Sequence, residues 1–153
     1  MTDPSQCMVL AGLAAMIGAE TIVESGTYKG AATRALAEAN PKARVWTADL
    51  VEYPEVADLP PNTRFYHGDF MDMLTAIQQP INFAYIDASG ADNKQTRLRL
   101  THSIAVADRL SPGGIICWDD TWTDWDGVKE IREFAQINLL AQKGLSKIGR
   151  AHV

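Results

Sequence analysis

Short apolar runs alternate with helical segments along most of this chain, and this alternation constrains the fold more than any other feature. Apolar runs with the length of buried strands lie at 21–24, 44–48, 63–66, 81–86 and 114–118. Helical patterns lie at 5–18, 30–39, 70–78, 93–110 and 128–141. Strands separated by helices pair in parallel through right-handed crossovers. We therefore expect an α/β, doubly wound, mainly parallel sheet with helices on both faces.

The chain reads as one domain over 1–153. It has no repeat, linker or low-complexity tract, and 46% of its residues are hydrophobic, enough for a real core. The net charge of −5 makes nucleic acid an unlikely partner. Cys7 and Cys117 lie in apolar surroundings without a paired spacing, so we expect free thiols. No segment reads as a membrane span or a secretion signal, so we expect a cytoplasmic protein.

The loop Glu24-Ser25-Gly26-Thr27-Tyr28-Lys29-Gly30 joins the first strand to a helix, as in folds that hold an adenine nucleoside. Gly26 allows a positive φ or a close approach of backbone to a ligand, and Gly30 allows tight helix packing. Asp49 follows the next strand, where it can accept hydrogen bonds from a ribose diol.

The loop favours a cofactor without phosphate. A dinucleotide fingerprint reads G-x-G-x-x-G, whereas this loop reads E-x-G-x-x-x-G, which speaks against NAD. Glu24 would repel a phosphate and suits an amine-bearing, cationic group. These features point to S-adenosylmethionine (SAM).

Acidic residues follow all five expected strands. They are Glu24, Asp49, Asp69, Asp87 and the pair Asp119-Asp120. Because the carboxyl ends of parallel strands share one edge, these carboxylates should converge there. Asp87, Asp119 and Asp120 come from strands expected to be neighbours, and carboxylates suit a hard cation such as Mg²⁺.

The order and spacing of five motifs resemble a class I SAM-dependent methyltransferase of the small O-methyltransferase type, like the macrolide-sugar and catechol enzymes. The resemblance covers about residues 20–130. The motifs are VESGTYKG (23–30), VWTADL (45–50), FYHGDF (65–70), INFAYIDAS (81–89) and LSPGGIICWDDTW (110–122).

The resemblance implies a Rossmann-like fold and a role for each matched residue. The methionine part of SAM would be lined by Glu24, Gly26, Tyr28 and Gly30. Asp49 would bind the ribose, and Asp69 with Phe70 would flank the adenine. Asp87 would contact the cofactor's amino group or Mg²⁺, with Asp119 and Asp120 as further metal ligands.

The implied reaction is an in-line SN2 transfer of methyl to a hydroxyl of a small molecule or sugar, with the metal lowering the hydroxyl pKa. Candidate catalytic residues are Asp87, Asp120 and His102, with Lys94 as a further candidate base. Trp118, Trp122 and Trp125 either wall the acceptor pocket or pack in the core.

Two departures from the family pattern keep alternatives open. The segment after 81–86 reads D-A-S-G-A-D, where many relatives have D-G-D-H or a nearby lysine, which leaves a metal-independent N- or small-molecule methyltransferase as an alternative. Only twelve residues follow Ala141, enough for one strand (145–148), so we expect a sheet truncated at its C-terminal hairpin. An exposed sheet edge favours a homo-oligomer, and a reduced substrate region leaves a non-catalytic SAM-binding module open.

Overall fold

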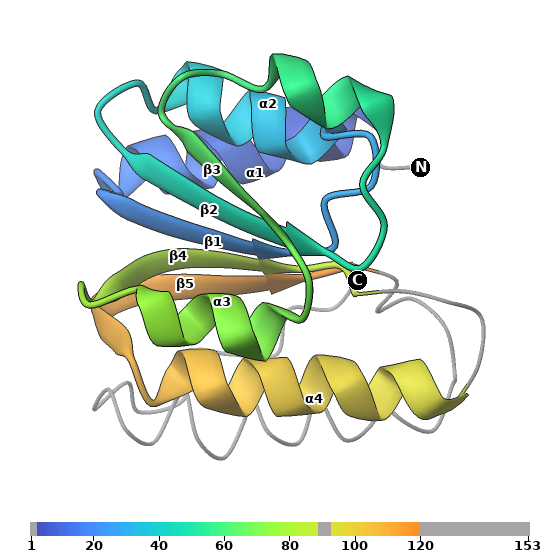
Figure 1. Cartoon of the computed structure of the whole chain (residues 1–153). Helices are drawn as coiled ribbons and strands as arrows, with labels where there is room; N and C mark the ends of the chain where they lie inside the picture. The colour runs from blue at the N-terminus through green and yellow to red at the C-terminus, as the bar shows by residue number, and fades with distance from the viewer. Residues whose placement is uncertain (1–2, 89–92, 120–153) are drawn as a thin grey trace.

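The computed structural model describes residues 3–88 and 93–119, which form a three-layer α/β unit (Figure 1). The strands are β1 (Thr21–Ser25), β2 (Arg44–Asp49), β3 (Thr63–His67), β4 (Ile81–Ile86) and β5 (Leu110–Trp118). The helices are α1 (Pro4–Met16), α2 (Ala31–Ala39), the short η1 (Pro54–Asp58), α3 (Phe70–Ala76) and α4 (Asn93–Ala107).

The sheet is parallel, with strand order β3-β2-β1-β4-β5. The chain passes outward from β1 through β2 to β3 and then crosses back to β4, on the other side of β1. Strand order therefore reverses between β1 and β4, and ligands of doubly wound sheets bind beyond the carboxyl ends at such a point. The predicted fold class is confirmed.

Each face of the sheet carries its own apolar core. On one face, α1 and α2 cover a cluster that includes Leu10, Leu36 and Phe83. On the other, α3 and α4 cover a cluster that includes Met73 and Val106. Because neighbouring strand residues point to opposite faces, strands buried on both sides read as unbroken apolar runs. That explains why the central strands β1 and β4 could be read from the sequence.

Two predicted boundaries around β5 are wrong. The helix expected over 93–110 ends at Ala107, and Leu110 already pairs with Ile81. The strand expected over 114–118 begins at Leu110, and the Pro112-Gly113-Gly114 segment is a bulge within it, where the register moves from Ile81↔Leu110 to Phe83↔Ile115. Gly113 has φ +80°, which only glycine adopts readily. The elements expected over 128–141 and 145–148, and with them the truncated hairpin, lie outside the described residues.

Both cysteines are free thiols, as predicted, with Cys7 buried and Cys117 half-buried. Within residues 3–88 and 93–119, no helix combines the length and apolarity needed to span a membrane.

Candidate functional site

A cavity of about 870 Å³ lies beyond the carboxyl ends of the strands, at the point where strand order reverses. All five described strand-end acids line it, namely Glu24, Asp49, Asp69, Asp87 and Asp119. Gly26, Tyr28, Phe70 and His102 line it as well. Its volume lies within the roughly 300–1,000 Å³ typical of small-molecule sites. The expected convergence of carboxylates on one edge of the sheet is therefore observed.

Gly26 fits against the backbone of β4 more closely than any side chain would allow. Its φ is +94°, and a Cβ built there would lie 2.4 Å from the Asp87 carbonyl oxygen. The Gly26 N–H donates to the Ala48 carbonyl at 2.9 Å, and the Asp87 N–H donates to the Ser25 carbonyl at 2.8 Å. These bonds fix the loop between β2 and β4, so the absence of a side chain here is a requirement of the fold.

Gly30 is the one predicted cofactor residue in the described chain that does not line the cavity. It precedes α2 with φ +77°, and a Cβ there would lie 2.8 Å from Leu59 Cδ2. The glycine therefore lets the start of α2 pack against the segment that leads into β3. This is a packing role, distinct from the predicted contact with methionine.

Glu24, which the sequence predicts to suit a cationic group, lines the cavity but is buried, with 1% of its surface exposed. Its Oε2 accepts hydrogen bonds from the hydroxyls of Thr47, at 2.6 Å, and Thr33. Burial raises the pKa of this carboxyl to about 7, although the two hydroxyls oppose that rise. Glu24 therefore links β1 to β2 and α2 beneath the cavity and changes charge near neutral pH.

We expect Glu24 to make the folded protein less stable as pH rises from about 5 to 8. The folded-state pKa of about 7 exceeds the ordinary value of 4.5, so the folded state binds this proton more tightly than the unfolded state. The stabilisation that comes from protonated Glu24 is fully present below pH 4.5, the pKa of Glu24 in the unfolded chain. It is lost as the pH rises through about 7, the pKa of Glu24 in the folded protein. One pKa unit corresponds to about 1.4 kcal/mol, so the loss is on the order of 3 kcal/mol.

The measurement is thermal unfolding of wild type and Glu24→Gln between pH 5 and 8. The variant keeps an oxygen acceptor but cannot ionise, so its stability relative to wild type should rise steadily with pH. A difference between the two proteins that stays constant across this range would contradict the assignment.

Asp49 organises two loops at the rim of the cavity. Its Oδ2 accepts from the Tyr28 N–H at 2.7 Å, and its Oδ1 accepts from the Val51 N–H at 3.0 Å. Tyr28 has φ +48°, the only positive φ at a non-glycine residue in the described chain. Backbone strain of this kind is often held at functional sites.

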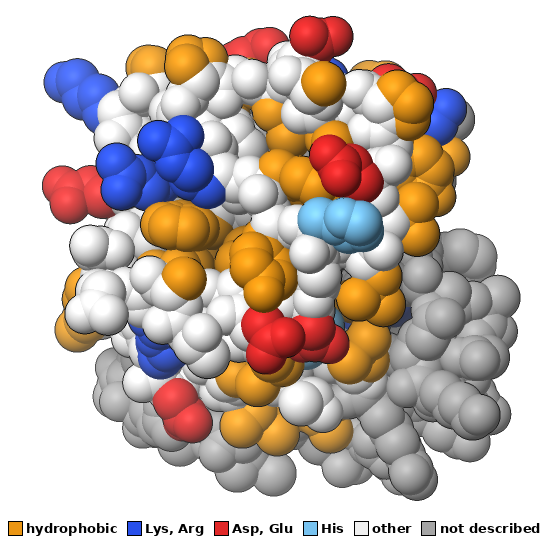
Figure 2. Space-filling model, in the orientation of Figure 1, with side chains coloured by type: hydrophobic (Ala, Val, Ile, Leu, Met, Phe, Trp, Pro, Cys, Tyr) orange, Lys and Arg blue, Asp and Glu red, His pale blue; other side chains and the backbone are white. Residues whose placement is uncertain are grey.

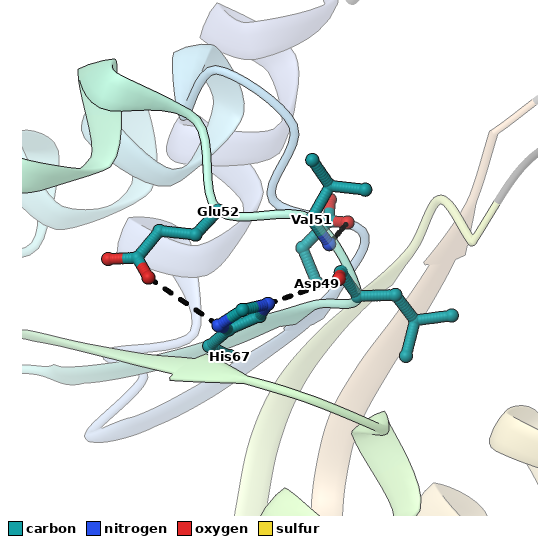
Figure 3. Close-up of polar contacts among 5 residues, drawn as sticks. Asp49, Val51, Glu52 and His67 are labelled. Atoms are coloured by element: carbon teal, nitrogen blue, oxygen red, sulfur yellow. Dashed lines mark hydrogen bonds and ion pairs between the residues drawn. The ribbon is translucent and has the colours of Figure 1, made fainter.

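The segment after Asp49 is also held from β3. His67 Nε2 donates to the Leu50 carbonyl at 3.2 Å, and His67 Nδ1 lies 3.5 Å from a Glu52 carboxylate oxygen (Figure 3). Glu52 itself does not line the cavity. The segment that follows Asp49 is therefore held in place by His67. Glu52, the next acid along the chain, contacts His67 and not the cavity.

A buried histidine closes the inner wall of the cavity. His102 on α4 is 2% exposed, and its ring packs on Phe70 with centroids 4.7 Å apart. Its Nδ1 lies 2.8 Å from Ser25 Oγ, and its Nε2 has no hydrogen-bond partner in the described chain. Burial lowers the pKa of His102 to about 4, so the ring is neutral at pH 7 and a weak proton acceptor there. Asp69, beside Phe70, accepts from the Met71 N–H and caps α3.

Asp87 and Asp119 form a coupled pair where β4 and β5 end side by side. Burial, reinforced by Asp119, raises the pKa of Asp87 to about 8. Gln6 from α1 donates to Asp119 Oδ1 at 2.6 Å. Arg99 donates to the Ala88 and Asp119 carbonyls, both at 3.2 Å, and so ties the two strand ends together. At neutral pH Asp87 therefore carries a proton, unless a cation bound between the two carboxylates takes the proton's place.

The predicted metal set is only partly placed, because Asp120 lies outside the described residues. Within those residues, no group of three metal-ligating side chains is arranged around one point. Trp122, Trp125 and the Lys94 side chain also lie outside the described part. Trp118 is described and does not line the cavity, since its Nε1 donates to Ser103 Oγ at 2.7 Å and its ring packs in the core.

Gln6 and Ser25 line the cavity and Thr47 supports Glu24, although the sequence did not indicate these three residues. Each acts through a partner from a different element, so spacing along the chain does not reveal it. The polar side chain of Gln6, in a helix that holds no other polar side chain after Ser5, was the one available signal.

Residues 23–121 match the family model described as "Methyltransferase domain". The chain is similar in structure to the O-methyltransferase TomG from Streptomyces achromogenes, involved in tomaymycin synthesis, solved in complex with SAM. That likeness has a TM-score of 0.69 and 22% identity over 93% of this chain and 70% of that chain. The chain is also similar in structure to an O-methyltransferase from Bacillus cereus in complex with SAH. That likeness has a TM-score of 0.66 and 22% identity over 93% of this chain and 71% of that chain. No curated protein sequence matches the chain.

Proposed function

Because the chain belongs to the methyltransferase-domain family, matched over residues 23–121, we propose that it transfers the methyl group of SAM to a hydroxyl of a small molecule or sugar. The observation that carries the proposal is the cavity at the carboxyl ends, which combines a glycine cradle at Gly26 with an acidic lining. An acidic lining opposes phosphates and suits a positively charged cofactor. Two solved structures of similar fold contain SAM or SAH.

The residues present fit SAM from one end of the cavity to the other. Gly26 would leave room for the methionine part, with the Asp87 carboxyl beside it. Asp49 would accept from the ribose hydroxyls, and the buried Phe70 ring with Asp69 would flank the adenine. His102 Nε2, which lacks a partner in the described chain, would position the bound cofactor through a hydrogen bond.

SAM supplies an electrophilic methyl group, so the protein's contribution is to align the acceptor oxygen and promote the loss of its proton. His102, with a pKa of about 4, is a weak proton acceptor at pH 7, and Asp87, with a pKa of about 8, already holds a proton there unless Mg²⁺ replaces it, so water would take the hydroxyl proton. Mg²⁺ held by Asp87, Asp119 and Asp120 would lower the pKa of the hydroxyl and fix the oxygen near the donor.

The experiment that tests the cofactor is isothermal titration with SAM, SAH and NADH, with and without Mg²⁺. Binding of SAM and SAH without NADH supports the proposal, and binding of NADH alone would overturn it. Turnover on a panel of phenols, sugars and amines identifies the acceptor. If SAM binds but no member of the panel is methylated, the non-catalytic module is favoured.

We expect Asp119→Asn to lose at least about tenfold in Mg²⁺ affinity while SAH affinity changes less than threefold. The amide keeps the size of the carboxylate but removes the charge that Mg²⁺ requires. Titration of Mg²⁺ into the SAH complex measures the first effect directly, without knowledge of the acceptor. Asp108→Asn is the matched control, because Asp108 is an exposed acid on the loop between α4 and β5. Equal Mg²⁺ binding by wild type and Asp119→Asn, or turnover unaffected by a chelator, would favour the metal-independent alternative.

A further inference from the structure

A second cavity, of about 470 Å³, lies at the opposite end of the sheet, where β1, β2 and β3 begin. Figure 2 shows Lys and Arg side chains gathered on the side of the molecule where the strands start in Figure 1. Lys42, Arg44 and Arg64 line this cavity together with Trp46. It shares no lining residue with the first cavity.

Three cations meet at this cavity in a chain whose net charge is −5. Lys42, Arg44 and Arg64 are exposed, and within the described residues none of them forms an ion pair. Arg64 donates only to its neighbour, the Thr63 carbonyl, at 3.1 Å. One acid, Glu20, also lines the cavity, so an excess of positive charge remains.

The walls are held by hydrogen bonds that leave the arginine side chains available. Asn62 Nδ2 lies within 3.0–3.2 Å of the carbonyls of Ala37, Asn40 and Ala43, which fixes the turn before β2. The Arg44 N–H donates to the Glu20 carbonyl at 2.8 Å, and Asn82 Oδ1 accepts from the Glu20 and Thr21 N–H groups. A preformed site avoids the entropic cost of ordering its walls when a ligand binds.

Trp46, which also lines the cavity, has a hydrogen-bond donor without an acceptor in the described chain. Its indole N–H is buried and has no hydrogen-bond partner in the described chain. Arg44 precedes Trp46 by two residues on β2, so both point to the same face of the sheet, and Arg64 on β3 is the register partner of Trp46. A buried donor without an acceptor costs about 1–3 kcal/mol, so a ligand oxygen that reached this N–H would be stabilised by it.

We propose that this second cavity binds a phosphate-bearing anion through Arg44 and Arg64, with Lys42 adding charge. Guanidinium groups match phosphate oxygens in pairs, and two arginines with a lysine suit a ligand that carries more than one negative charge. Strand β2 alone spans six residues, about 20 Å at roughly 3.3 Å per residue, so the anion binds far from the first cavity. The site is therefore separate from methyl transfer and does not depend on the function proposed above.

Titration of pyrophosphate and of uridine diphosphate into the protein, with SAH saturating the first cavity, tests the proposal. We expect binding in the submillimolar range that weakens as NaCl increases. The double variant Arg44→Gln/Arg64→Gln should bind at least about tenfold more weakly. Both side chains are exposed, so folding should be retained, which unchanged thermal unfolding would verify. Tighter binding of uridine diphosphate than of pyrophosphate would identify a nucleotide as the ligand class, and equal binding would identify the phosphates alone.

Lys29→Gln is the charge control, because it removes one positive charge near the other end of the sheet. Since Lys29 lines the first cavity, SAH is added at a concentration that saturates this variant as well. Lys29 is exposed and forms an ion pair with Glu55 at 3.1 Å. This variant should bind pyrophosphate as wild type does. No binding of either anion at about 5 mM, roughly five times the upper end of the expected range, would overturn the proposal. Equal affinity in the double arginine variant would overturn it as well.

Discussion

Gly26→Ala is expected to lower SAM affinity by at least about 100-fold and to destabilise the protein by several kcal/mol. The added methyl group would lie 2.4 Å from the Asp87 carbonyl oxygen, and backbone cannot yield as a flexible side chain can. The φ of +94° adds strain, because alanine adopts this region at a cost of roughly 1–2 kcal/mol. The clash and the backbone strain can be relieved only if the loop moves away from β4. That movement would displace the backbone that we propose contacts the methionine part of SAM. Isothermal titration with SAM and thermal unfolding measure the two effects.

Gly12→Ala is the matched control for this substitution. Gly12 lies in α1, and a Cβ there would meet nothing within 4 Å. Alanine is the better helix former by about 1 kcal/mol, so this variant should be at least as stable as wild type. A Gly26→Ala protein that bound SAM within threefold of wild type would show that the loop is not the cofactor cradle.

Asp49→Ala is expected to weaken SAM binding by about 30- to 100-fold with a smaller effect on stability. The substitution removes the acceptor proposed for the ribose hydroxyls. It also frees the Tyr28 N–H and Val51 N–H, which hold the rim of the cavity. Hydrogen bonds to a charged acceptor contribute about 1.5–3 kcal/mol each, which gives the expected range. Titration with SAH should show the same loss, because SAH keeps the ribose.

Glu52→Ala offers a close control for Asp49. Glu52 is an acid three residues further along the same turn, pairs with His67 and does not line the cavity. Its removal should leave SAM affinity unchanged. Similar losses in Asp49→Ala and Glu52→Ala would instead indicate a general effect of charge on a cationic ligand.

The sequence predicts the central strands β1 and β4 well because they are buried on both faces, whereas β3 at the edge of the sheet is largely exposed. The runs at Thr21 and Ile81 are apolar without alternation, and the acids that follow them mark the carboxyl edge. The extent of β5 was harder to predict, because Pro112 and two glycines are typical of a turn. Here they form a bulge within the strand, an arrangement that depends on pairing with β4.

The role of Glu24 could not be predicted from local spacing. Its position after apolar residues suggested a carboxylate for a cationic group but gave no sign of Thr33 and Thr47, which approach it from α2 and β2. These contacts exist only once three elements have packed together, and burial then changes the pKa of the carboxyl. The contact of Gln6 with Asp119 could not be predicted either, because it forms only in the folded protein between residues that lie 113 positions apart in the sequence.

A crystal structure of the protein grown with SAH would show directly where the cofactor binds. We expect the ribose hydroxyls at Asp49, the homocysteine part along Gly26 and the adenine beside Phe70, all within the cavity at the carboxyl ends of the strands. SAH bound elsewhere, or a cavity that contains only solvent at an SAH concentration well above the solution dissociation constant, would contradict the proposed cofactor site.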